Sequence, residues 1–241
     1  MKNKQLILAT DLDGTFLAGS EQEKTQFYQL LSEQKNTISV IFVTGRTLNL
    51  VKELYTSGFN FIPDYIIADH GTIVVHGHNF EYVETLQAEI IKQWNQSKHD
   101  QLRQLLQTQA VEEQPFNPPY RHAYYYDNLR FNHDCVVDIE ALGFECILSH
   151  DVFLDILPSG FNKGSTLQKL ITGLKVSPEK ILTCGDSLND LPLFKTGYKS
   201  VAVGNAEASL VEKIQSMDNV FHSQHPGVLG IIDGLMNWSV F

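Results

Sequence analysis

The fold follows from the stretch QLILATDLDGT, residues 5–15. Its first six residues are an apolar run ending at Asp11, which predicts a buried strand of a parallel sheet. Asp11 and Asp13 are one residue apart at this strand end, so their carboxylates project the same way, and Gly14 lets the chain turn sharply. Such a pair favours a cation, and Mg²⁺ suits it because Mg²⁺ takes oxygen ligands and keeps positions for water or phosphate. A strand ending in a solvated Asp turn is the alternative for this segment alone.

Strand and helix patterns alternate outward from this segment. The expected strands are 5–10, 38–43, 180–184 and 199–203, and the expected helices lie near 21–34, 48–55, 164–174, 188–195 and 227–237. This alternation predicts a doubly wound α/β fold, in which a parallel sheet carries its site at the carboxyl ends of the strands.

The middle of the chain has a different pattern. Residues 85–108 form a polar, Gln-rich helical stretch, a proline-containing linker follows, and strand-like pieces occupy 121–126, 145–149 and 152–157. We therefore expect an α+β module inserted at 78–158 into a core made of 1–77 and 159–241.

Two further motifs offer groups that can hold a phosphate. Thr44, Gly45 and Arg46 follow the second strand and open a helix, where backbone N–H groups and the Thr hydroxyl can hold a phosphate oxygen. A purely structural helix cap is the alternative. Lys163, in GFNKGST, offers a compact positive charge just before a helix, although a surface lysine is the default for this residue type. The order KGST rather than GKST argues against a nucleotide-binding P-loop.

The fourth motif, CGDSLND at 184–190, again directly follows a strand. Asp186 is placed to complete a metal site and Asp190 to bind its water shell, while Asn189 can orient Asp11 or a phosphate oxygen. A helix cap is the alternative for these polar groups. The order of the four motifs, each at a strand end or a helix start, favours a common site over four separate caps.

Composition narrows the classes of protein. A formal net charge of −10 and a pI of about 5.3 argue against nucleic acid as a partner, since the sequence shows no basic patch. The three cysteines lack CxxC spacing, so neither a disulfide framework nor a zinc site is expected. The N-terminal apolar run is too short for a signal peptide or membrane span, so we expect a soluble, cytoplasmic protein without a membrane partner.

Together the four motifs resemble those of the haloacid dehalogenase superfamily of phosphatases, over essentially the whole chain. The insertion between the second and third motifs resembles the C2-type cap of that superfamily. LDILPSGFNKG, CGDSLNDLPLF and HPGVLGIIDGL look most like sucrose-phosphate phosphatases and related sugar-phosphate phosphatases. One departure is Gly14, where the sucrose-phosphate enzymes tend to have Asn.

The resemblance implies a Mg²⁺-dependent phosphoric monoester hydrolase and a role for each residue. Asp11 is the expected nucleophile and becomes a phosphoaspartate, and Asp13 is the expected general acid and base. Asp11, the Asp13 carbonyl and Asp186 would bind the metal, with Asp190 in its surroundings. Thr44 and Lys163 would hold the transferring phosphoryl oxygens.

The inserted module is expected to select the leaving group, a phosphorylated sugar such as a disaccharide phosphate. Arg121, His122 and the tyrosines at 124–126 are one candidate sugar-binding face, although ordinary strand aromatics are the favoured interpretation. Asp69 and His70 follow the apolar run YIIA. They either face the substrate or have a structural role in a turn. His76 and His78 have no third metal ligand in the sequence, so we expect a structural or exposed role.

Two other functions stay open. A phosphosugar mutase would use the same aspartyl phosphate but return the group to the substrate, and a catalytically silent sensing protein would keep the fold alone. The sequence leaves the oligomeric state and the identity of the sugar open.

Overall fold

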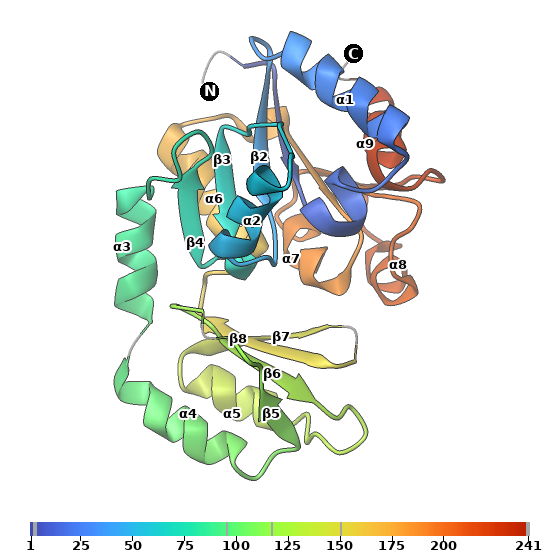
Figure 1. Cartoon of the computed structure of the whole chain (residues 1–241). Helices are drawn as coiled ribbons and strands as arrows, with labels where there is room; N and C mark the ends of the chain where they lie inside the picture. Colours follow the sequence, from blue (N-terminus) through green and yellow to red (C-terminus); the bar gives the residue numbers. More distant parts are fainter. Residues whose placement is uncertain (2–3, 95, 117, 150, 240–241) are drawn as a thin grey trace.

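The computed structural model describes residues 1, 4–94, 96–116, 118–149 and 151–239, with a larger α/β part and a smaller α+β part (Figure 1). The larger part contains a seven-stranded sheet. In spatial order its strands are β11 (Val220–His222), β10 (Lys199–Ala202), β9 (Ile181–Gly185), β1 (Leu6–Thr10), β2 (Ile38–Val43), β3 (Tyr65–Ala68) and β4 (Ile73–His76). Neighbours are parallel except β3 and β4, which confirms the predicted parallel α/β core.

Both faces of this sheet are covered by helices. Leu6 and Leu8 of β1 belong to one hydrophobic cluster, and Ile7 and Ala9 belong to another. Because successive side chains of a strand point to opposite faces, the two clusters lie on opposite sides of the sheet. The first cluster packs against α1 (Glu21–Glu33), α2 (Leu48–Thr56) and α9 (Gly227–Asn237), and the second against α3 (Glu84–Gln93), α6 (Lys163–Leu174) and α7 (Leu191–Phe194).

The smaller part is an antiparallel sheet with helices on one face (Figure 1). Its strands, in spatial order, are β5 (Val111–Glu113), β6 (His122–Tyr126), β8 (Phe153–Pro158) and β7 (Phe144–Ser149), and its helices are α4 (His99–Leu106) and α5 (Cys135–Ala141). A separate hydrophobic cluster, which includes Leu102, Ile139 and Ile156, fills the space between them. We call this part the cap; the domain limits at 78 and 158 stay a prediction.

The helical stretch predicted over 85–108 is not continuous. Its first half, α3, packs on the large sheet through Leu86 and Ile90, whereas α4 packs in the cap. Trp94, at the end of α3, has non-helical backbone angles (φ −73°, ψ 71°) and is buried in the cap cluster. The helix breaks because its two halves bury their apolar faces against different sheets.

Several elements escaped the sequence analysis because their apolar patterns are short. They are β4, β5, β11, α5, α8 (Ala208–Ile214) and the single turns η1 (Leu12–Phe16), η2 (Asp69–Gly71), η3 (Gln96–Lys98) and η4 (Pro178–Lys180); the helix predicted near 188–195 is present as the turn η5 (Leu188–Asp190) and α7. Within the described residues, every helix is too short or too polar to cross a membrane.

Candidate active site

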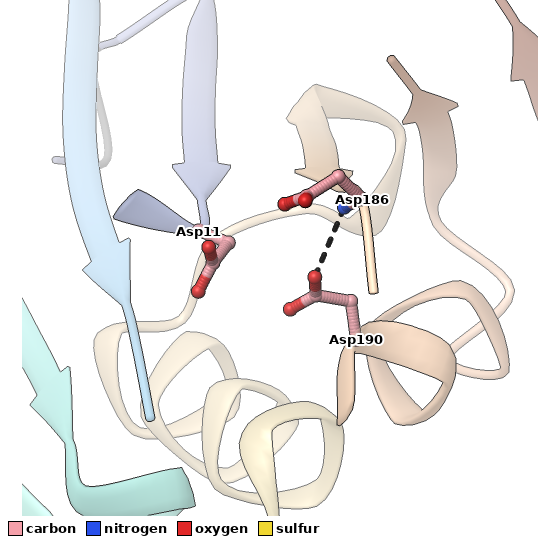
Figure 2. Close-up of side chains that lie close together, drawn as sticks. All are labelled: Asp11, Asp186 and Asp190. Carbon is pink, nitrogen blue, oxygen red and sulfur yellow. Dashed lines mark hydrogen bonds between the residues drawn. The ribbon is translucent and has the colours of Figure 1, made fainter. Parts of the chain in front are cut away.

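Two neighbouring strands bring the predicted carboxylates together. Asp11 follows β1 and Asp186 follows β9, and these strands are parallel partners, so both residues lie at the same edge of the sheet. The Asp11 N–H donates to the Cys184 carbonyl (2.9 Å) and extends the pairing to the strand end. In Figure 2 the side chains of Asp11, Asp186 and Asp190 lie close together, and those of Asp186 and Asp190 point toward the side where Asp11 lies.

These three carboxylates form a group that fits a divalent cation. One oxygen from each of Asp11, Asp186 and Asp190 lies within 4.8 Å of the others. Burial raises the pKa of Asp186 to about 7, and repulsion from Asp190 adds to this. Burial likewise raises the pKa of Asp11 well above its usual range, against the attraction of Lys163. Buried carboxylates that repel one another need positive charge, and oxygen donors are what Mg²⁺ prefers.

Lys163 supplies part of that positive charge. It is fully buried at the start of α6, and its Nζ donates to Asp11 Oδ1 (2.7 Å), to Asp190 Oδ1 (2.5 Å) and to Asn189 Oδ1. Burial alone would lower the pKa of Lys163, but the two carboxylates outweigh it and raise the pKa above its ordinary value. A surface lysine, the alternative for this residue, is therefore excluded.

Asp190 also organises the loop beneath the site. Its Oδ2 accepts from the backbone N–H of Asp186 (3.0 Å, dashed in Figure 2) and from that of Ser187 (3.2 Å). The side chain is fully buried and thus joins the ammonium of Lys163 to the turn that carries Asp186. Asn189, expected to orient Asp11, instead accepts from Lys163, which itself contacts Asp11.

The turn after Asp11 depends on Gly14. Its φ of +75° favours glycine, and a Cβ at this position would lie 2.1 Å from Asp186 Oδ2. The next residue, Thr15, donates from Oγ1 to Asp186 Oδ1 (2.7 Å). The turn therefore packs directly against Asp186 of the fourth motif, which follows β9, and the Thr15 hydroxyl holds its carboxylate.

Thr44, Gly45 and Arg46 lie at the end of β2, beside the same edge. Thr44 is buried, and its Oγ1 accepts from the Arg46 N–H (3.1 Å). The Arg46 guanidinium donates from Nε and Nη2 to the carboxylate of Asp13 (2.7 and 2.6 Å). The side chain of Asp13 is thus paired with Arg46 and is not part of the group formed by Asp11, Asp186 and Asp190. A metal contact through the Asp13 carbonyl stays a prediction.

A pocket of about 410 Å³ lies over this edge, a size suited to a small ligand. From the large sheet it is lined by Asp11, Asp13, Gly14, Gly45, Arg46, His70, Asp186, Ser187 and Asn189, and from the cap side by Gln114, Phe116, Arg121, Ser149, Phe153 and Asp155. Thr44, Lys163 and Asp190 are buried beneath the lining. All of the predicted site residues thus gather at one edge, and the cap closes the pocket from the other side.

The sequence analysis predicted only some of the cap residues that line the pocket. Arg121 lines the pocket, but Tyr124 and Tyr126 are buried in the cap cluster with His122 beside them, as expected for ordinary strand aromatics. Among the residues that sequence reasoning missed is Asp155, whose only signal was a charge inside the apolar strand FLDILP. Asn205, which donates from Nδ2 to the Gly14 carbonyl (2.9 Å), was also missed.

Three other histidines named from the sequence, His70, His76 and His78, lie outside the group of carboxylates. His76 stacks against Tyr65, with ring centroids 4.9 Å apart, and lies 5.8 Å from the ring of His78. His70 lies in the pocket wall, where burial lowers its pKa well below the usual range, assisted by Arg121 and Lys163.

Known proteins resemble this chain over nearly its whole length. A family model described as sucrose-6F-phosphate phosphohydrolase matches residues 4–239. Glucosylglycerol-phosphate synthase of Pseudomonas anguilliseptica is 34% identical over 97% of this chain, which is 31% of that protein. Mannosylfructose-phosphate phosphatase of Agrobacterium fabrum is 26% identical over 97% of both chains. Sucrose-phosphatase 1 of Nicotiana tabacum is 25% identical over 98% of this chain and 60% of its own length. The chain thus spans about a third of the synthase and 60% of the Nicotiana protein.

Solved structures show the same architecture. The sucrose-phosphatase of Synechocystis sp. PCC6803, solved in complex with sucrose and phosphate, matches with a TM-score of 0.85 and 25% identity over 98% of both chains. A haloacid dehalogenase-like hydrolase from Bacillus subtilis matches in fold, with a TM-score of 0.72 and 17% identity over 100% of this chain and 94% of that one. The resemblance drawn from the four motifs is confirmed.

Proposed function

The chain belongs to the sucrose-6F-phosphate phosphohydrolase family, and from this premise we propose that it hydrolyses a phosphorylated sugar, such as the disaccharide phosphate sucrose 6-phosphate, with Mg²⁺ as cofactor. The observation that carries the proposal is the contact of Lys163 with both Asp11 and Asp190 at the base of a pocket closed by the cap. A carboxylate nucleophile, Asp11, with the buried ammonium of Lys163 beside it suits attack on a phosphate ester.

In the proposed reaction an Asp11 oxygen attacks phosphorus and the bond from phosphorus to the sugar oxygen breaks. Asp13 gives a proton to the departing sugar oxygen, and the product at this stage is a phosphoaspartate. Asp13 then takes a proton from water, whose oxygen attacks phosphorus and releases inorganic phosphate, which restores the Asp11 carboxylate. The exposed position of Asp13 at the pocket lets it reach the leaving group.

The other site residues position and neutralise charge. Lys163 and Thr44 would hold the phosphoryl oxygens, with the backbone of Gly45, the side chain of Arg46 and Asn189 as further contacts. Asp11, Asp186 and the Asp13 carbonyl would hold Mg²⁺, with Asp190 next to them; the bound ion supplies positive charge that lets an anionic nucleophile approach an anionic phosphate. For Arg46 to reach the phosphate, it would have to share or release Asp13.

The proposed substrate class rests on the family and on the polar pocket wall. Ser149 and Gln114 of the cap offer hydrogen-bonding groups that suit sugar hydroxyls, and Phe116 and Phe153 offer apolar surface. A cytoplasmic location is part of the proposal and is supported by three free cysteines. No nucleic-acid partner is proposed, because of the net charge of −10.

The test is release of inorganic phosphate from a panel of mono- and disaccharide phosphates by the purified chain with MgCl₂, with an Asp11→Asn variant as the blank. The expected result is that the wild type releases phosphate from a sugar phosphate and that Asp11→Asn does not. Isomerised sugar phosphate without free phosphate would indicate the mutase instead, and no reaction with any phosphomonoester would favour the silent sensing protein.

A further inference from the structure

A strained turn lies at the centre of the site, between the phosphate-side loops and the cap. Asp69, His70 and Gly71, the residues of η2, have successive φ values of 54°, 58° and 111°. Asp69 and His70 are non-glycine residues in the left-handed region, which is strained for residues with a Cβ. Surrounding contacts must hold this conformation, and such strain concentrates where function requires it.

On its core side the turn holds the loop at the end of β2. The Asp69 N–H donates to the Arg46 carbonyl (2.8 Å), and the His70 N–H donates to the Thr44 carbonyl (3.1 Å). The His70 ring packs so closely on Gly45 that a Cβ there would lie 2.7 Å from Cε1. The position of residues 44–46 therefore depends on this turn.

The same turn also contacts the start of α6. Thr166 Oγ1 donates to the Gly71 carbonyl (2.8 Å), and a Cβ on Gly71 would lie 2.4 Å from the carbonyl carbon of Asn162. Asn162 directly precedes Lys163. One turn is thus in contact with both elements that are proposed to hold the phosphate.

The cap reaches this turn through Arg121. Its Nε and Nη2 both lie 2.8 Å from Asp69 Oδ1, and Nη1 donates to Asp155 Oδ1 on β8. His70 Nε2 lies 3.5 Å from the other oxygen of Asp155. Arg121, Asp69 and Asp155 are all at most 4% exposed.

Burying these charges is costly for a contact that only attaches the cap. A guanidinium and two carboxylates lose their hydration, and well-packed apolar residues would stabilise an interface as well or better. What an arginine fork adds is geometry, because its donors span two acceptors in fixed directions. Within the cap, Asp155 orients the guanidinium of Arg121. The other two nitrogens of that guanidinium contact Asp69 in the core.

We propose that Arg121 is a positioning residue, which couples the closed cap to the phosphate-holding loop 44–46 through Asp69 and the strained turn. The inference rests on the proposed phosphatase activity. With the cap in place, Arg121 holds Asp69, and Asp69 and His70 hold the carbonyls of Arg46 and Thr44. Without that contact the turn relaxes and the loop loses its position.

The test compares Arg121→Lys with Arg103→Lys, an exposed cap arginine paired with Asp100. Arg121→Lys keeps the charge but not the fork, so kcat is expected to fall about tenfold or more, since displaced binding groups slow catalysis strongly. The fall should be similar for the sugar phosphate and for p-nitrophenyl phosphate, and Arg103→Lys should leave both rates unchanged. Amide hydrogen exchange at residues 69 and 70 should rise in Arg121→Lys.

A second variant, Asp155→Asn, removes the charge that orients Arg121 within the cap. In this variant kcat should fall and amide exchange at residues 69 and 70 should rise, each by a smaller factor than in Arg121→Lys. The inference is overturned if folded Arg121→Lys keeps kcat within about twofold and exchanges like the wild type, because a merely structural contact changes stability alone. It is also overturned if only the sugar phosphate reaction suffers, since that marks a sugar contact. Absence of activity in the wild type would instead reject the proposed function.

Discussion

The ammonium of Lys163 lies 2.7 Å from Asp11 Oδ1, although the two residues are 152 positions apart in the sequence. Since Lys163 is fully buried, its charge is balanced by its carboxylate neighbours rather than by solvent. This contact joins the predicted nucleophile to the predicted phosphate-binding group, and it makes the site sensitive to the loss of either partner.

Replacing Lys163 by methionine should abolish phosphatase activity and destabilise the fold by about 3–5 kcal/mol, because Asp11 and Asp190 are left buried without their cation. Urea unfolding and phosphate release measure the two effects. Lys169→Met is the matched control, since Lys169 is partly exposed and lies 3.6 Å from Glu89. Equal stability of the two variants would contradict the prediction.

Gly14→Ala should remove activity beyond its effect on stability. The backbone strain at φ +75° costs about 1–2 kcal/mol, and the new methyl group would also displace the carboxylate of Asp186. Gly197→Ala is a control for strain alone, because its φ is +79° and nothing lies within 4 Å of a Cβ there. We expect both variants to unfold at lower temperature but only Gly14→Ala to lose turnover; similar turnover in both would count against a role for the Gly14 contact.

Removing Mg²⁺ with a chelator should stop the reaction, and added Mg²⁺ should raise the unfolding temperature. At a concentration of 100 times Kd the stabilisation is about 2.7 kcal/mol. Asp186→Asn relieves the repulsion with Asp190, so this variant should be at least as stable as the wild type without metal, yet gain nothing from Mg²⁺. The exposed Asp218→Asn should behave like the wild type in differential scanning fluorimetry.

His122 should make stability fall in mild acid. Burial lowers its pKa to about 4, and the nearby His99 and Arg103 contribute. Above pH 6.5 the ring is neutral in both the folded and unfolded chain, so it has no effect on pH dependence. Between pH 6.5 and 4 only the unfolded chain takes up the proton, which costs up to about 3 kcal/mol of stability.

His122→Phe keeps an aromatic ring in the cap cluster and should lose less stability than the wild type over this pH range. The exposed His222→Gln serves as the control. Identical pH profiles of unfolding free energy for wild type and His122→Phe would argue against a buried neutral His122.

The local sequence was enough to predict most strands of the core and the residues expected at the site. Apolar runs ending in polar groups predicted β1, β2 and β9, and since the carboxyl ends of parallel strands share one edge, Asp11, Thr44 and Asp186 were expected together. The same logic failed for the stretch 85–108, because local polarity does not show which of two sheets each half packs against.

The sequence alone predicted the strand ends, the pair of carboxylates at Asp11 and Asp13, and the inserted α+β part, because these depend on periodicity and on neighbouring residues. Tertiary structure decided how the cap meets the core. Arg121 contacts Asp69, 52 positions away, and Asp155, 34 positions away, and no local pattern marks such pairs. Likewise, only the packing of Gly14 against Asp186 showed why that turn requires glycine. Burial removes solvent from these contacts, so each group depends on its partner, and only the folded chain decides which groups are buried.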